Sequence, residues 1–159
     1  MDLLLSLEKM LYVNPKRKKR AVIYMIIEKY MTKRETNVYG DDVTTYEVKC
    51  VKINKNITII KNAHGDYAEI EIHPHLDRGW KSKCRTINTF IEKIDGLGDY
   101  IDEFDDVEIE ADLAHFKNEK GQTCTRYLDD PHISIAVDYE DEEELDHIVE
   151  NFIKLFIKS

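Results

Sequence analysis

The stretch VTTYEVKCVKINKNITIIKNAHGDYAEIEIH, residues 43–73, decides the fold, because it holds three short segments rich in β-branched and aromatic residues. These segments predict strands near 43–53, 57–61 and 67–73. Turn-forming residues separate them, first Asn54-Lys55-Asn56 and then the segment 62–66. Because both gaps are short, we expect neighbouring strands to pair antiparallel.

The residues before this stretch favour helices. Apolar residues at helical spacing predict a helix over 2–12, and Asn14-Pro15 can end it and open a second one. The segment 21–33 has features of both helix and strand, and we favour a helix. A turn is expected over 37–42.

The residues after this stretch alternate between helices and strands. A helix is expected over 82–95, a single helical turn near Tyr100, and a final helix opening at Asp141 with Glu144 three residues later, as in a capping box. Strands are expected over 107–116, 122–128 and 132–139. Because no βαβ alternation occurs, we predict one α+β domain spanning 1–159, with an antiparallel or mixed sheet and helices packed on one face.

Composition narrows the class of protein. The chain has 159 residues, of which 42% are apolar and 35% charged, which suits one domain with one core. No apolar run approaches the length of a membrane span. The three cysteines are far apart and form no C-x-x-C pair. We therefore expect a cytoplasmic protein with reduced thiols and no membrane association.

Charge is distributed unevenly along the chain. Residues 1–93 hold 18 basic and 12 acidic residues, a balance of +6, whereas residues 94–159 hold 5 and 20, a balance of −15. Such asymmetry points to a charged partner.

The acidic half gives the predicted partner-binding surface. In the strand 107–116, acidic residues alternate with apolar ones, so the carboxylates would form a row on one face. A second acidic group lies at the start of the last helix. The candidate residues of both groups are Asp105, Asp106, Glu108, Glu110, Asp112, Glu140, Asp141, Glu142, Glu143 and Glu144. The alternative is an ordinary solvated face, since acids also stabilise helix N-termini.

A second hypothesis concerns His73-Pro74-His75-Leu76-Asp77 at the end of a predicted strand. Two imidazoles and a carboxylate can hold zinc or iron, so these residues could serve a small metal-dependent hydrolase. The pattern resembles the first ligand motif of metallo-β-lactamase-type hydrolases, but Arg78 stands where that family has a histidine. Further ligands would come from His64, His115, His132 or His147, although His115 falls in the apolar register of its strand and favours a core position.

Other motifs are weaker. His132-Ile133-Ser134 resembles half of the paired H-x-S/T motif of two-histidine phosphoesterases, and no second half is present. Basic residues cluster at 16–20 and 78–85 and could grip phosphates, but the net acidity argues against direct nucleic-acid binding. No P-loop or dinucleotide fingerprint occurs, and we expect no cofactor.

In size, acidity and absence of a catalytic motif, the chain resembles phage-encoded anti-CRISPR inhibitors. It is also similar in kind to acidic immunity proteins that neutralise toxin nucleases. Neither resemblance carries over individual residues. Both imply a non-enzymatic inhibitor whose acidic surface occupies a basic site on a nuclease or its nucleic-acid complex.

Overall fold

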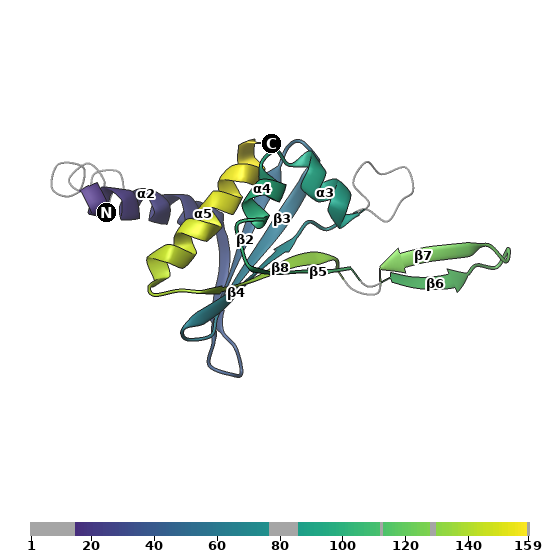
Figure 1. Cartoon of the computed structure of the whole chain (residues 1–159), viewed down its shortest axis with the longest axis horizontal. Helices are drawn as coiled ribbons and strands as arrows, with labels where there is room; N and C mark the ends of the chain where they lie inside the picture. The colour runs from purple at the N-terminus through teal and green to yellow at the C-terminus, as the bar shows by residue number, and fades with distance from the viewer. Residues whose placement is uncertain (1–14, 77–85, 112, 128–129, 159) are drawn as a thin grey trace.

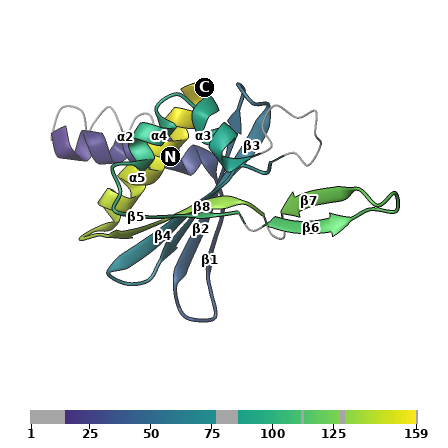
Figure 2. The same cartoon turned by 45° about the vertical axis from the view of Figure 1, so that its right-hand side comes forward.

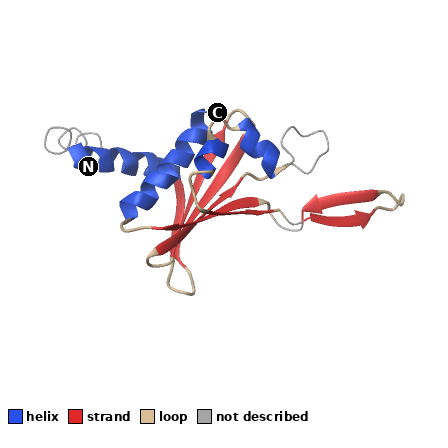
Figure 3. Ribbon diagram, in the orientation of Figure 1, coloured by secondary structure: helices blue, strands red, loops and turns tan. Residues whose placement is uncertain are grey.

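A computed structural model describes residues 15–76, 86–111, 113–127 and 130–158 of the chain. These residues form a six-stranded sheet, a separate two-stranded hairpin, and helices that lie on one side of the sheet (Figures 1 and 3). Every strand pair in them is antiparallel. The predicted α+β class, with helices packed on one face of the sheet in a single domain, is confirmed.

The sheet is a meander that is completed by strands from the C-terminal half. Its order is β1 (Met31–Thr36), β2 (Asp42–Cys50), β3 (Lys55–Ala63), β4 (Tyr67–His73), β8 (His132–Asp138) and β5 (Asp106–Glu110). Strands β2, β3 and β4 are the three predicted from residues 43–73, with boundaries shifted by a few residues. Strand β8 inserts between β4 and β5, so it joins the N-terminal meander to the acidic edge strand β5.

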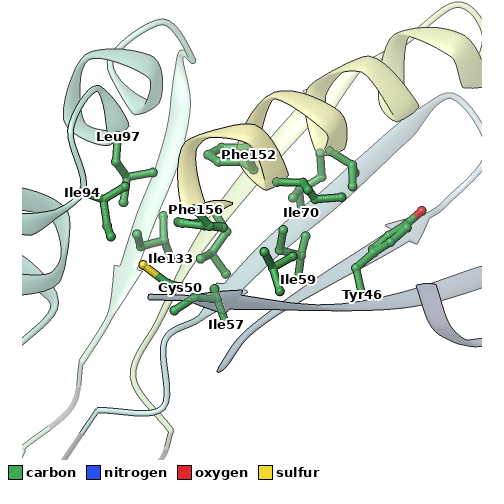
Figure 4. Close-up of a cluster of buried hydrophobic side chains, with 14 of the residues drawn as sticks. Tyr46, Cys50, Ile57, Ile59, Ile70, Ile94, Leu97, Ile133, Phe152 and Phe156 are labelled. Atoms are coloured by element: carbon green, nitrogen blue, oxygen red, sulfur yellow. The ribbon is translucent and has the colours of Figure 1, made fainter. Parts of the chain in front are cut away.

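The core lies between the sheet and the helices (Figure 4). The helices are α2 (Pro15–Tyr30), α3 (Ile87–Lys93), α4 (Leu97–Ile101) and α5 (Glu142–Lys158). On β4, Ala68, Ile70 and Ile72 are fully buried, and on α5 so are Phe152 and Phe156. Full burial of each large apolar side chain contributes about 1.5–3 kcal/mol, so this alternation fixes which face of each strand meets the helices.

Helix α5 begins as the sequence predicts. The Asp141 carboxylate accepts a hydrogen bond from the Glu144 backbone N–H at 3.1 Å, and the Glu144 carboxylate accepts one from the Glu140 N–H at 3.0 Å. These bonds satisfy donors that a helix start leaves unpaired. The predicted apolar face of this helix is confirmed, with Leu145 and Val149 buried alongside the two phenylalanines.

The predicted single strand over 107–116 is wrong. Strand β5 ends at Glu110, and the chain leaves the sheet to form a hairpin from β6 (Leu113–Lys117) and β7 (Thr123–Tyr127), which lies apart from the sheet (Figures 1 and 2). The partner strand explains the break. Glu110 pairs with His132, and the residue before His132 is Pro131, which has no N–H to continue the ladder.

The N-terminal part differs from the prediction at one point. The helix favoured for 21–33 ends at Tyr30, and the chain continues directly into β1, which pairs with β2. The predicted turn before β2 is confirmed, since the Asn37 side chain accepts hydrogen bonds from the Tyr39 and Asp41 N–H groups.

Two further predictions fall partly or wholly outside the described residues. The helix expected over 2–12 lies outside them, as does the first part of the helix expected over 82–95. The described part of the latter is α3, whose N-cap is Thr86. None of the helices in the described ranges is both long enough and apolar enough to cross a membrane.

Candidate functional site on the open sheet face

The open face of the sheet, opposite the helices, carries the outward side chains of three neighbouring strands, β4, β8 and β5. The register places Glu71 opposite Ser134, and Ser134 opposite Glu108. These three residues therefore form one row across the strands, with adjacent strands about 4.8 Å apart. Side chains on β4 and β5 lie on either side of β8 and about 10 Å from each other.

Strand β5 carries an uninterrupted row of carboxylates. Asp106, Glu108 and Glu110 alternate along this edge strand and are all exposed. Alternate residues of a strand are about 7 Å apart, so the charges are evenly spaced. None of the three forms an ion pair with another described residue.

Carboxylates on β4 and β8 extend this row into a surface. Glu69 and Glu71 project from β4, and Asp138 lies at the end of β8 opposite Tyr67. We call this surface the acidic sheet face, defined by Glu69, Glu71, Asp106, Glu108, Glu110 and Asp138. The sequence analysis missed its β4 members, although the alternation of YAEIEIH places them on the face opposite Ile70 and Ile72.

The second predicted acidic group, at the start of α5, has local partners. Asp141 and Glu144 make the capping hydrogen bonds described above, and Glu143 pairs with Arg20 of α2 at 2.6 Å. Glu140 and Glu142 are exposed. Of the other predicted residues, Asp105 is exposed just before β5, and Asp112 lies outside the described residues. The predicted partner-binding set is thus divided between two places in the fold.

A cluster of histidines lies next to the acidic sheet face. The rings of His73 on β4 and His132 on β8 stack, with centroids 4.4 Å apart and planes 19° apart. Glu71 Oε1 is 3.2 Å from His73 Nε2 and 3.3 Å from His132 Nε2. The three side chains are 13–27% exposed, so their interaction is partly shielded from water.

Asp130 forms hydrogen bonds with the Nδ1 atoms of both rings, on the side away from Glu71. Its carboxylate Oδ2 is 3.0 Å from His73 Nδ1, and its backbone carbonyl is 2.9 Å from His132 Nδ1. One residue in the loop before β8 thus fixes the orientation of two imidazoles. Such hydrogen bonds select which ring nitrogen carries the proton.

The electrostatics of the cluster favour charged forms. The hydrogen bond with His73 lowers the pKa of Glu71 and outweighs the opposing effect of burial. Burial lowers the pKa of His73, but its hydrogen bonds with Glu71 and Asp130 act in the opposite direction and leave that pKa above its ordinary value. These shifts favour an ionised Glu71 beside a protonated His73.

The H-x-H-x-D hypothesis is only partly supported by these positions. His73 belongs to the cluster, but His75 Nε2 is 2.7 Å from Thr58 Oγ1 and its Nδ1 is 3.7 Å from Asp130. Asp77 lies outside the described residues. The residues grouped with His73 are Glu71, two positions earlier on the same strand, and His132 from β8.

The remaining histidines lie elsewhere. His64 is 2.8 Å from Asp41, His147 is 3.4 Å from Glu150, and His115 is 3.0 Å from Thr125 on the hairpin. His115 is exposed, so the expected core position is wrong. The register argument failed because β6 does not belong to the main sheet.

The two basic segments are described only in part. Arg20 pairs with Glu143, and the segment 78–85 lies outside the described residues. Comparisons of this chain with protein-family models, with curated proteins and with solved structures give no match. The function must therefore be argued from the geometry and charge of the site.

Proposed function

We propose that this protein is a non-enzymatic inhibitor that occupies a basic site on a nucleic-acid-processing nuclease. The observation that supports the proposal best is the row of Asp106, Glu108 and Glu110, which are exposed and form no ion pair with any other described residue. A surface of this kind is available to a cationic partner, whereas a surface neutralised by its own lysines is not.

The spacing of the row suits long-range attraction. Two unit charges about 7 Å apart in water repel each other by only about 0.6 kcal/mol, so a folded sheet tolerates the row easily. Repeated along β5, however, the same charges sum to a field of one sign. A groove that evolved to hold phosphates presents the complementary field. Regularly spaced carboxylates on a rigid sheet would occupy that groove as a substitute for the nucleic-acid backbone.

The sheet also limits what association costs. The three carboxylates lie on a strand held by the complete β5–β8 register from Asp106–Ala136 to Glu110–His132. Because the backbone is already ordered, binding need only immobilise side chains, and this reduces the entropy lost on association. Charged residues on an edge strand additionally discourage pairing with another sheet, which keeps the row exposed.

A CRISPR effector nuclease is the first partner to test, and a toxin nuclease of the kind that immunity proteins neutralise is the second. Purified protein should be added to cleavage reactions of both classes. We expect inhibition that weakens as salt rises, because exposed charges are screened within about 10 Å at 0.1 M salt. Inhibition of neither class of nuclease would contradict the proposal.

The decisive variant is Asp106→Lys/Glu108→Lys/Glu110→Lys. We expect association with the nuclease at least about tenfold slower, since steering by charge changes on-rates by about 10–10³-fold. The matched control is Glu28→Lys/Glu92→Lys/Glu119→Lys, which alters net charge equally at exposed positions off the acidic sheet face. Equal inhibition by the two triple variants would show that only net charge matters and would exclude β5 as the binding surface.

A further inference from the structure

One carboxylate oxygen and two ring nitrogens converge in the histidine cluster. Glu71 Oε1 lies 3.2 Å from His73 Nε2 and 3.3 Å from His132 Nε2, and one ligand atom from each residue lies within 4.8 Å of the others. A carboxylate oxygen offers only lone pairs, and a neutral imidazole has one nitrogen that donates and one that accepts. What fills the space between these atoms depends on which nitrogens carry the protons.

Asp130 determines which ring nitrogens carry the protons. Its contacts with His73 and His132 are both with Nδ1 atoms, one through the carboxylate and one through the backbone carbonyl, and both of these groups are acceptors. The Nδ1 atoms must therefore donate, which leaves the Nε2 lone pairs of the neutral rings directed at Glu71. Three acceptors facing one another are stable only around a cation. Protonating both rings would place two positive charges on rings that stack 4.4 Å apart.

We propose that Glu71, His73 and His132 bind a divalent transition-metal ion of the zinc class, through Oε1 and the two Nε2 atoms. Tetrahedral zinc with ligands at about 2.0–2.2 Å separates neighbouring ligand atoms by about 3.3–3.6 Å. The measured separations from the carboxylate to each imidazole are close to this range. Asp130 already orients both imidazoles beside Glu71.

The ligand set selects the kind of ion. Two imidazole nitrogens suit zinc, cobalt, nickel or iron(II), whereas magnesium and calcium prefer sites made of oxygen atoms. Three protein ligands leave a coordination position open for water or for a group from another molecule, as in catalytic rather than structural zinc sites. Asp130 acts as a positioning residue, since hydrogen bonds to the far nitrogen of a ligating histidine orient the ring and raise its basicity.

The inference does not depend on the proposed nuclease inhibition. The β5 row that carries that proposal contributes no metal ligand, and a metal ion can be detected without any partner. The two proposals can therefore fail separately, and the following experiments address only the metal.

The first test uses the full-length protein without an affinity tag, after chelator treatment and dialysis. Calorimetric titration with zinc chloride should show one ion bound per chain, with magnesium and calcium chloride giving no competition. Cobalt(II) should give the visible absorption of a site of low coordination number. Absence of stoichiometric zinc binding would overturn the proposal and leave protonation as the state of the cluster.

The second test removes the ligands individually. His73→Ala, His132→Ala and Glu71→Gln should each weaken zinc binding by at least about tenfold, and Asp130→Asn should weaken it by about 10–100-fold. The matched control is His115→Ala, an exposed histidine on the hairpin, which should bind zinc like the wild type. Wild-type affinity in His73→Ala or His132→Ala would overturn the proposal.

A measurement on the unaltered protein guards against variants that misfold. Nitrogen-15 NMR of histidine side chains should show zinc shifting the Nε2 resonances of His73 and His132, while their Nδ1 atoms remain protonated. If zinc instead shifted only His64 or His147, the ion would be bound elsewhere and the assignment would be wrong.

Discussion

Two acidic regions of similar composition have different surroundings in this fold. The first turn of α5 and the residue before it supply Asp141, Glu143 and Glu144, and each of these has a partner within the chain. The row on β5 has the same kinds of side chain, but none of its members pairs with another described residue. Charge density alone therefore does not show whether carboxylates have partners within the chain. The distinguishing property is whether the local backbone or a neighbouring helix uses the carboxylate.

A third acidic residue of α5, Asp146, also has a partner within the chain, and this one is largely buried. Asp146 meets Lys61, which extends from the helix-facing side of β3, at 2.9 Å and with both side chains largely buried. Removing one member of a buried ion pair destabilises the fold, because the other charge then stays buried without a partner. If this division is correct, substitutions should destabilise the fold most at Lys61, less at Asp141 and least in the β5 row.

Replacing Lys61 should have the largest effect. Lys61→Met leaves Asp146 without its partner, and we expect the free energy of unfolding to fall by about 2 kcal/mol. Breaking a fully buried pair costs about 3–5 kcal/mol, and the expected loss is smaller here because Asp146 keeps some access to water. Urea denaturation measures this change. Lys61→Met/Asp146→Asn should recover part of it; no recovery would mean that packing rather than charge was lost.

The pH dependence of this pair has a defined sign. Burial lowers the pKa of Lys61, but its interactions with Tyr46 and Asp146 outweigh burial and leave that pKa above its ordinary value. The folded state therefore holds this proton more tightly than the unfolded state. The resulting stabilisation is fully present below the ordinary lysine pKa and is lost as pH rises through the raised one. The stability gap between wild type and Lys61→Met should narrow only in that alkaline range.

Removing the helix cap should have an intermediate effect. Asp141→Ala deletes the acceptor for the Glu144 N–H, and we expect a loss of about 1 kcal/mol in the free energy of unfolding. Asp141→Asn keeps an acceptor and should lose less. If the alanine and asparagine variants were equally unstable, the helix-dipole charge rather than the hydrogen bond would be the main contribution.

Neutralising the β5 row should have the smallest effect on stability. Asp106→Asn/Glu108→Gln/Glu110→Gln removes no ion pair between described residues, so the thermal midpoint should stay unchanged or rise slightly as repulsion is relieved. A marked fall in the midpoint would show that these carboxylates support the fold, and the contrast between the two acidic regions would disappear.

Much of the fold was predictable because its signals are local. The strand composition of β4 and the capping residues of α5 act over a few neighbouring positions, and both elements were predicted correctly from the sequence. The end of β5 at Glu110 was not predicted. Its partner strand β8 begins at His132, directly after Pro131, and this proline is more than 20 residues away in the chain. Strand β1 was missed because the segment 31–36 pairs with β2 rather than packing an apolar face of its own.

In the candidate site, too, the local features were predictable from the sequence and the long-range contacts were not. The sequence predicts that Asp106, Glu108 and Glu110 share a face, because side chains alternate along a strand, and β5 places them so. The sequence named His73 but paired it with His75 and Asp77, its neighbours in the chain. The structure pairs it with His132, 59 positions later in the sequence, because β8 inserts between β4 and β5.

The amino-acid sequence by itself determined the α+β class, the three-strand meander, the amphipathic last helix and the excess of negative charge near the C-terminus, since these follow from local periodicity and composition. Only the tertiary structure decided which carboxylates are left without a partner among the described residues, and which histidines meet around Glu71. Both outcomes depend on the order of strands in the sheet, and that order is set by contacts between residues far apart in the chain.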